Sequence, residues 1–462
     1  MMQAPFIKNN PEFQKNCWLE LNQTRLILMP VILALIFLLS STISGREQMT
    51  MTLRYISLSA FVILTVLWGA KQVAESLMDE IKEKTWDWQI MSVISPRKMM
   101  LGKLFGSTIF QWYGGILSIS FYLATFLLNN ELILGLKLTL LNISFAVLAQ
   151  SLSLMIGLMS MKNETVQKNK LFKSTFSFLG LIYLMSGMGV MNFVNSNSTN
   201  VPWFFIQFKS LDLALLTVVI FTFWAITGVE RLMRAEFQFR NGLRAWLSFV
   251  AFISFYFLGF IVEIPNFDLA QKTLIFFGIV ALSNLFLSSV TILFSSKEIT
   301  MFRRMKKNFL SKNWLKFNAD LAPWQMSAII AVLNCLIVAF LSFFIEFEGN
   351  GIASGKIFQI NFVIALMFFF LRDLTLILFS NLIYGKRGDS LAYVLLFLLY
   401  FVLPWIFETA TFGSLWMLFL PFHKSMTNEI PFNFIFPMIQ FLALLYFYVR
   451  KWQSLENEVN KT

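Results

Sequence analysis

Few side chains in this sequence are of the types that perform acid–base, nucleophilic or metal chemistry. His423 is the only histidine, and Cys17 and Cys335 are the only cysteines, so neither a clustered metal site nor a disulfide framework is expected. The nearest match to a phosphate-binding loop is residues 351–357 (Gly-Ile-Ala-Ser-Gly-Lys-Ile). It has three residues between its glycines instead of four, and Ile357 replaces the Ser or Thr that would bind magnesium. The sequence therefore predicts no ATPase or hydrolase site in this chain.

One charged pair, Arg372 and Asp373, lies among apolar residues. It follows the apolar run 357–371 and precedes the mostly apolar stretch 374–384. Charges at membrane depth are costly, and they usually pair or face a cavity. The pair is therefore either a polar element on a permeation path or between two halves, or a pair just inside the cytosolic boundary with Arg372 reaching toward the headgroups. From the sequence we favour the second interpretation.

The composition indicates a membrane protein. The chain has 462 residues, of which 57% are hydrophobic and only 13% charged, whereas soluble globular proteins carry about 25% charged residues. The net charge of +12 does not indicate nucleic-acid binding, because the basic residues are spread over several loops and form no single patch. Residues 1–25 are polar and mixed, so we expect no cleavable signal peptide. Cys335 lies within an apolar run, where we expect a small core residue.

Charge-free stretches predict an all-α bundle of about twelve membrane-spanning helices. They lie at 26–45, 55–70, 104–130, 138–161, 174–191, 213–229, 245–262, 274–296, 324–345, 357–371, 391–407 and 431–449. Two of them, 55–70 and 357–371, have 16 and 15 residues, fewer than the roughly 17–25 residues of a membrane-spanning helix. Each continues into an amphipathic stretch, so we expect both helices to be longer. The apolar segment 411–422 is too short to span, and we expect it to be re-entrant or interfacial.

The loops predict the orientation of these spans. With the N-terminus in the cytosol, 30 of the 37 Lys and Arg residues fall on the inner side and seven on the outer side. Cytosolic loops of membrane proteins carry such an excess of positive charge. The expectation is a multi-pass protein of the bacterial cytoplasmic (inner) membrane, with both termini in the cytosol.

The most informative hydrophilic segment is 71–103, between the second and third predicted spans. Three apolar residues recur there near helical spacing, with charged residues between them: Val73, Leu77 and Ile81. This pattern predicts an amphipathic helix, and Trp86 and Trp88 are candidate apolar anchors for a protein partner. The alternative is an interfacial linker with both tryptophans among the lipid headgroups.

Pro96 cannot continue that helix, and Ser92 or Ser95 is expected to cap the next one.

The segment 80–106 resembles the cytosolic loop between the second and third membrane helices of ABC-2-type transporter permeases. In that family, a charged helix leads through a Thr and a short linker to Ser-Pro, and Gly-Lys opens the next span. The residues that fall at these positions are Thr85, Ser95, Pro96, Gly102 and Lys103.

The resemblance implies the permease subunit of an ATP-binding-cassette exporter. A separate ATPase subunit, in two copies, would bind ATP and Mg²⁺ and dock on the segment, so no cofactor is expected in this chain. The implied coupling residues are Glu80, Lys84, Thr85, Trp86, Trp88, Ser95, Pro96, Gly102 and Lys103. Members of the family export lipids, glycans, peptides or hydrophobic drugs. The lack of a charged pore favours an apolar or amphipathic cargo.

Two amphipathic segments that precede long spans, 10–25 and 308–324, resemble the elbow helix before the first span of ABC-2 permeases and favour a diverged tandem of two six-helix units. The expected organisation is four parts: an elbow segment in 1–25, a first six-helix unit in 26–244, two further helices and a basic loop in 245–307, and a second elbow-like segment with the last helices in 308–462. The basic cluster at 297–316 either determines topology or binds anionic lipid headgroups.

Two other functional classes remain open. A secondary transporter would work without an ATPase, and it should contain paired ionisable residues or broken helices in both halves. A membrane-embedded lipid-modifying enzyme would need catalytic polar groups gathered at one face. The sequence offers only Arg372 and Asp373 for the first class and no such group for the second.

Overall fold

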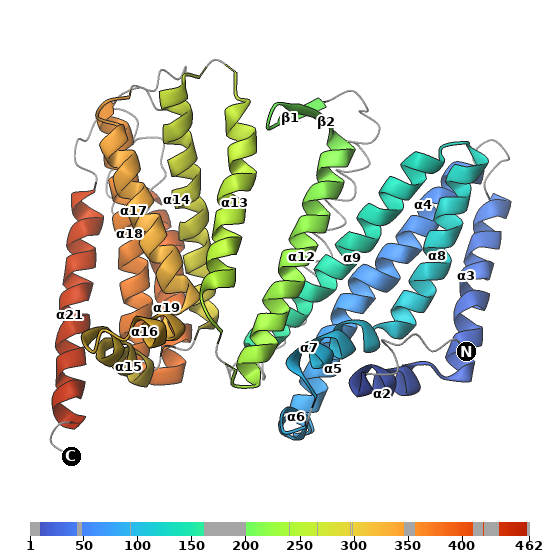
Figure 1. The fold of residues 1–462 in the computed structure, drawn as a ribbon, viewed down its shortest axis with the longest axis horizontal. Coiled ribbons are helices and arrows are strands. Elements are labelled where there is room, and N and C mark those ends of the chain that lie inside the picture. Colours follow the sequence, from blue (N-terminus) through green and yellow to red (C-terminus); the bar gives the residue numbers. More distant parts are fainter. Residues whose placement is uncertain are drawn as a thin grey trace. The chain divides into compact units, whose positions relative to one another are not determined.

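In the computed structural model the chain is almost entirely helical (Figure 1). The structure describes residues 10–43, 49–160 apart from 93, 200–345 apart from 240, 266, 296 and 298, 356–409, 419 and 434–459. It divides into two compact units. Unit 1 comprises Met1–Val201 and Gln207–Asn241, and unit 2 comprises Pro202–Ile206 and Gly242–Thr462. Each unit is described by itself.

Unit 1 contains long membrane-type helices and, at one end, a group of short ones. In chain order its helices are α2 (Pro11–Glu20), α3 (Gln23–Ile43), α4 (Met49–Phe61), η1 (Val62–Trp68), α5 (Gly69–Lys82), α6 (Trp86–Ile90), α7 (Pro96–Leu101), η2 (Gly102–Gly106), α8 (Ile109–Leu128), α9 (Leu132–Ser160) and α12 (Ser210–Glu236). Strands β1 (Asn200–Trp203) and β2 (Ile206–Lys209) form a two-stranded hairpin that the sequence did not predict.

Unit 2 has the same general construction. Its helices are α13 (Arg244–Val262), α14 (Leu269–Phe294), α15 (Ile299–Leu310), α16 (Trp314–Asp320), α17 (Pro323–Leu341), α18 (Lys356–Tyr384), η3 (Gly385–Arg387), α19 (Gly388–Phe397), η4 (Leu398–Val402), α20 (Leu403–Thr409) and α21 (Ile435–Val459). The elbow-like sequence segment 308–324 includes the end of α15, all of α16 and the start of α17. Lys312, between α15 and α16, adopts a left-handed conformation (φ 53°).

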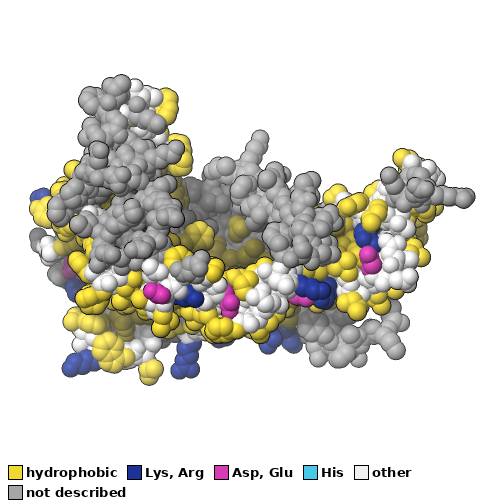
Figure 2. Space-filling model, turned by 90° about the horizontal axis from the view of Figure 1, so that it is seen from above, with side chains coloured by type: hydrophobic (Ala, Val, Ile, Leu, Met, Phe, Trp, Pro, Cys, Tyr) yellow, Lys and Arg dark blue, Asp and Glu magenta, His cyan; other side chains and the backbone are white. Residues whose placement is uncertain are grey.

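The chain is a multi-pass helical membrane protein. Within the described residues, nine helices are long and apolar enough to cross a bilayer. Both short apolar runs are extended as expected, since they belong to the helical stretch Met49–Lys82 and to α18. Among the described residues visible in Figure 2, hydrophobic side chains are widespread and charged side chains form small separate groups. The predicted span 174–191 and the segment 411–422 (apart from Phe419) lie outside the described residues, as does His423.

Helix directions in unit 1 agree with the alternation predicted from the sequence. The Lys137 ammonium near the start of α9 lies 2.5 Å from Asp212 Oδ1 near the start of α12, so these two helices run parallel, as the fourth and sixth predicted spans should. Tyr113 at the start of α8 donates a 3.2 Å hydrogen bond to Leu26 O at the start of α3. The first and third spans are therefore also parallel.

Unit 2 alternates in the same way. Lys297, just after α14, lies 2.6 Å from Asp389 at the start of α19. Lys306 of α15 lies 2.8 Å from Glu456 near the end of α21. The end of α14, the start of α19, the end of α21 and the short helices α15 and α16 therefore share one end of the unit, which is the end predicted to be cytosolic.

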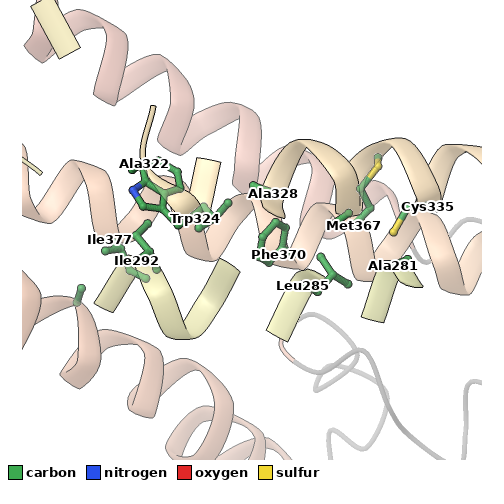
Figure 3. Close-up of a cluster of buried hydrophobic side chains, with 13 residues drawn as sticks. Ala281, Leu285, Ile292, Ala322, Trp324, Ala328, Cys335, Met367, Phe370 and Ile377 are labelled. Atoms are coloured by element: carbon green, nitrogen blue, oxygen red, sulfur yellow. The ribbon is translucent and has the colours of Figure 1, made fainter. Parts of the chain in front are cut away.

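The core of unit 2 lies between α14, α17 and α18 (Figure 3). Small residues at the contact allow the backbones of α14 and α17 to approach closely, as is usual between membrane helices: Ala281, Ala328, Ala331 and Cys335. Trp324 and Phe370 fill the wider spaces beside them. Cys335 is 1% exposed, which confirms that it is a core residue.

Candidate functional site

The best-defined polar site of unit 1 is built around Lys103, whose side chain is only 1% exposed. Its ammonium lies 2.9 Å from Glu12 Oε1 and also contacts Glu80 Oε2. Lys15 lies 3.0 Å from the same oxygen of Glu12 and 3.0 Å from Glu80 Oε1. Two acids and two bases thus form a neutral network that joins α2, the last turn of α5 and η2. We call Glu12, Lys15, Glu80 and Lys103 the base network.

The sequence around α2 explains why this helix forms and where it is held. The Asn10 side chain accepts a 3.3 Å hydrogen bond from the backbone N–H of Phe13, and Pro11 occupies the first helical position; both features are typical of helix starts. The same Asn10 side chain donates a 2.8 Å bond to Lys98 O. One residue therefore caps α2 and attaches it to α7.

Two glycines allow α2 to lie directly on η2. A Cβ atom at Gly102 would be 2.7 Å from Glu12 Cβ, and one at Gly106 would be 3.1 Å from Asn16 Cβ. Asn16 also donates a 3.3 Å hydrogen bond to Gly102 O. The predicted residue Gly102 therefore has a structural role, because it provides the space in which the acids of α2 reach Lys103.

Charge pairing shifts two pKa values in the base network. Burial alone would raise the pKa of the Glu12 carboxyl, but Lys103 and then Lys15 stabilise its ionised form, and the net pKa is lowered. Burial alone would lower the pKa of Lys15, but its hydrogen bond to Glu80 and the charges of Glu12 and Glu80 raise it overall. Both groups are therefore charged at neutral pH.

The turn after α5 is fixed by backbone hydrogen bonds. Thr85 N–H bonds to Glu80 O (2.9 Å) and Lys84 N–H to Ile81 O (3.1 Å), the pairing of a Schellman motif. Lys84 has φ 58° in the left-handed position that usually holds glycine. Thr85 also bonds Glu80 O through its hydroxyl, at 3.2 Å. The predicted residues Glu80, Lys84 and Thr85 are thus parts of one turn.

The start of α7 has the features that its sequence predicts. The hydroxyl of Ser95 accepts a 3.5 Å hydrogen bond from the Lys98 N–H, and Pro96 takes the first helical position. Ser92 caps no helix start; its hydroxyl donates to Gln89 O instead, at 2.6 Å.

The two tryptophans of the segment, both predicted as apolar anchors for a partner, have different environments. Trp86 is 6% exposed and packs in a core with Leu77, Met100 and Met233. Trp88 is 77% exposed. Trp86 is therefore a core residue that holds α6 onto the bundle, and its side chain is not available to a partner. Of the two tryptophans, only Trp88 presents its side chain to solvent.

Sequence reasoning missed the α2 half of the base network. Glu12, Lys15 and Asn16 share one helical face at spacings of three and four residues, which predicts a polar face on α2. That spacing does not reveal the partner, because Lys103 is 91 residues from Glu12 in the chain and only the fold brings them together.

A second polar site lies in unit 2, midway along α18. Arg372 is 1% exposed, and its Nε donates to Asp373 Oδ1 (2.9 Å) while its Nη1 donates to Gln440 Oε1 of α21 (2.9 Å). Nη2 lies 2.8 Å from the same Asp373 oxygen, without hydrogen-bond geometry. The Tyr400 hydroxyl of η4 donates to Asp373 Oδ2, and the guanidinium lies 4.7 Å from the Phe369 ring centroid.

This site overturns the interpretation that Arg372 reaches out to the cytosolic headgroups. Twelve residues separate Arg372 from the end of α18 at Tyr384, which is about 18 Å of helix. The guanidinium is enclosed by α18, η4 and α21. It donates hydrogen bonds to Asp373 of α18 and to Gln440 of α21. Arg372 is therefore a buried polar residue midway along α18, and Asp373 beside it is 22% exposed.

The lowered pKa of Glu12 predicts how the stability of unit 1 depends on pH. The pKa of Glu12 is lower in the folded state, so its contribution to stability is present above its unfolded value of about 4.5 and is lost as the pH falls through the folded value. The raised pKa of Lys15 adds stability below about pH 10.5 that is lost at higher pH. We expect the difference in thermal midpoint between the wild type and Glu12→Gln to be constant from about pH 5 to 10 and to shrink in acid. A difference that grows in acid would contradict this assignment.

Gly102→Ala should destabilise unit 1 by about 1–3 kcal/mol, because the added methyl group overpacks the contact with Glu12. The matched control is Gly228→Ala in α12, where the nearest atom to a new Cβ is Met155 Sδ at 3.6 Å. That control should be neutral or stabilising, since alanine favours a helix over glycine. Thermal denaturation of both variants in detergent measures the difference, and equal midpoints would argue against a tight α2–η2 contact.

Replacing one residue of the Arg372–Asp373 pair should lower the free energy of unfolding more than replacing both. Arg372→Met leaves the Asp373 carboxylate, which is 22% exposed, without its cationic partner, and breaking a buried ion pair typically costs about 3–5 kcal/mol. The double variant Arg372→Met/Asp373→Leu leaves no uncompensated charge and should be more stable than either single variant. Thermal denaturation of Arg372→Met, Asp373→Leu and the double variant gives the coupling free energy between the two side chains. If the stability losses of the two single variants added up in the double variant, the two charges would not depend on each other.

Comparison of the chain with protein-family models, with curated proteins and with solved structures finds no match.

Proposed function

We propose that this chain is the permease subunit of an ATP-binding-cassette exporter, driven by a separate ATPase. The observation that carries the proposal is the exposed tip formed by residues 82–91, which the base network and the Trp86 core hold onto the bundle. Figure 1 shows α6 beyond the ends of α5 and α7 in unit 1. An element of this kind can receive a push from a partner and pass it to membrane helices.

The tip has the surface chemistry of a docking site. Trp88 and Met91 are 77% and 80% exposed, and their spacing of three residues puts both on one side of α6. The tip also exposes four charged residues, namely Lys82, Glu83, Lys84 and Asp87. Apolar anchors inside a polar rim are typical of protein interfaces.

The connections of the tip support its role in coupling. The stretch Met49–Lys82 is one continuous helical path from the membrane to the tip. Lys103 and Gly102 belong to η2, which leads into α8, and α2 leads into α3. A displacement of the tip would therefore reach α4, α8 and α3 together, and partner closure could shift the bundle between two arrangements.

The proposed architecture is twelve spans with both termini in the cytosol, in a bacterial cytoplasmic membrane. Supporting it are the nine candidate spans, the packed helices α8 and α21, and the apolar sequence 174–191. Two ATPase copies would serve one such chain. As ATP and Mg²⁺ would bind to them, the chain itself would need no cofactor.

An apolar or amphipathic cargo is supported by a half-open groove of about 390 Å³ between α3, α4, η1 and α8. Its wall is apolar and includes Leu33, Ile63, Trp68 and Phe110. The volume is in the range of small-molecule sites.

A secondary transporter is the second candidate, and the buried Arg372–Asp373 pair favours it. Ionisable residues enclosed at membrane depth often mark ion or substrate pathways. In this alternative, transport would require Asp373 and no ATPase, and the tip would be dispensable.

The test is co-purification of the tagged protein in mild detergent, comparing the wild type with Trp88→Ala/Met91→Ala. We expect a Walker-type ATPase to copurify with the wild type and to be lost by at least tenfold in the variant, because two interface anchors are worth about 1–2 kcal/mol each. Trp86 is left intact, since replacing it would disturb the core.

The matched control is Trp18→Ala/Leu19→Ala on α2, which removes two equally exposed apolar side chains (84% and 67%) and should retain the ATPase. Loss in both variants would show that exposed apolar residues act nonspecifically. No ATPase with any variant, together with transport that depends on Asp373, would replace the proposal with the secondary transporter.

A further inference from the structure

The helix pair α15–α16 in unit 2 carries a surface that the proposed function does not use. None of the residues of α15 is fully buried. Four large apolar side chains of the pair are exposed by 52–86%: Phe309, Leu310, Trp314 and Leu315. An apolar group of this size is unfavourable in water, so a partner or a lipid surface must cover it.

The apolar side chains are ordered by a cluster of three rings. Phe309 of α15 lies 5.7 Å from Trp314 and 5.5 Å from Phe317 of α16, between ring centroids. Trp314 and Phe317 are 6.1 Å apart at 89°. The cluster fixes the angle between the two helices and presents Trp314 and the adjoining Leu315 outward.

The charges of the pair divide into two groups. The first makes contacts within the protein: Arg303 Nη2 donates to Leu455 O (3.2 Å) and Lys306 pairs with Glu456 (2.8 Å), both on α21, and Arg304 pairs with Asp320 of α16 (3.0 Å). The second group consists of Lys307, Lys312 and Lys316. All three are exposed, and none makes an ion pair within the described part of the chain.

The position of the pair fixes its depth. α14 ends at Phe294 and α17 begins at Pro323, so α15 and α16 connect the ends of two membrane-type helices and lie at the level where such helices leave the bilayer. Phe302 of α15 packs edge-on against Trp452 of α21, with 6.2 Å between ring centroids. The pair is thus held at the end of the unit where α14 ends and α17 begins.

We propose that α15–α16 is a built-in binding surface for anionic lipid headgroups of the adjacent leaflet. Trp314, Leu310 and Leu315 would enter the boundary between headgroups and acyl chains, as in interfacial amphipathic helices. Lys307, Lys312 and Lys316 would contact the phosphates, each worth about fivefold in binding near an anionic surface. The three unpaired positive charges and the depth of the pair favour a lipid over a protein partner such as the ATPase. The proposal does not depend on the proposed function.

The test places a bimane fluorophore at Leu315→Cys in a Cys17→Ser/Cys335→Ala background of the full chain. The protein is reconstituted in nanodiscs of phosphatidylcholine, or of an equal mixture of phosphatidylcholine and phosphatidylglycerol, each with brominated acyl chains as quencher. We expect at least twofold stronger quenching in the anionic discs. High salt should remove this increase, because it screens exposed charges.

Two variants complete the test. Lys307→Gln/Lys312→Gln/Lys316→Gln should remove the increase in anionic discs and leave the fold intact, because these lysines are exposed. The same fluorophore at Met91→Cys on the tip, 80% exposed in the wild type, should be quenched weakly in both discs. Equal quenching of the Leu315 label in both lipid compositions would overturn the proposal, as would no quenching in either. Shielding of that label by an added ATPase without any effect of lipid would overturn it in favour of a protein partner.

Discussion

The organisation of unit 1 depends on the burial of one ammonium group. Lys103 is almost completely enclosed, and a charge removed from water must be neutralised and hydrogen-bonded by its neighbours. Glu80 comes from the end of α5 and Glu12 from α2, so satisfying Lys103 requires three separate segments to meet at one point. Gly102 is needed beside it because any larger side chain would keep α2 away. This requirement turns an N-terminal amphipathic helix and a hydrophilic loop into one structural module.

The buried polar contacts coincide with irregular turns of the long helices. Each of the three π-helical segments in the described chain contacts a polar side chain from another element. Gln150 donates to Thr65 O of η1 (2.8 Å), Asn16 to Gly102 O of η2 (3.3 Å), and Tyr400 of η4 to Asp373. In a bilayer a displaced backbone carbonyl must find a donor within the protein, and Gln150 and Asn16 supply such donors. π-turns often occur at functional sites, and in η1 and η2 a side chain from another element satisfies a carbonyl of the irregular turn.

Much of this structure could be predicted from the sequence. Charge-free runs located the long helices, and the Ser-Pro pair located the start of α7, because these features are local. The roles of individual side chains were harder to predict. Trp86 and Trp88 look alike in the sequence, but two positions along a short helix separate a core residue from an exposed one. The sequence favours a place for Arg372 at the boundary, because it does not show that Gln440 lies beside Arg372 and that Tyr400 lies beside Asp373. The partners of Lys103 depend on contacts between distant segments, and the apolar pattern does not specify them.

The central claim is that α2 and the tip move as one body because Lys103 joins them. It can be tested by electron–electron distance measurements between spin labels at Trp18→Cys on α2 and Met91→Cys on the tip, in a background without the native cysteines. Both sites are at least 80% exposed, so the labels should not disturb the core. A rigid module predicts a narrow distance distribution in the wild type that broadens strongly in Lys103→Met. A distribution that is already broad in the wild type, or one that Lys103→Met leaves unchanged, would contradict the account.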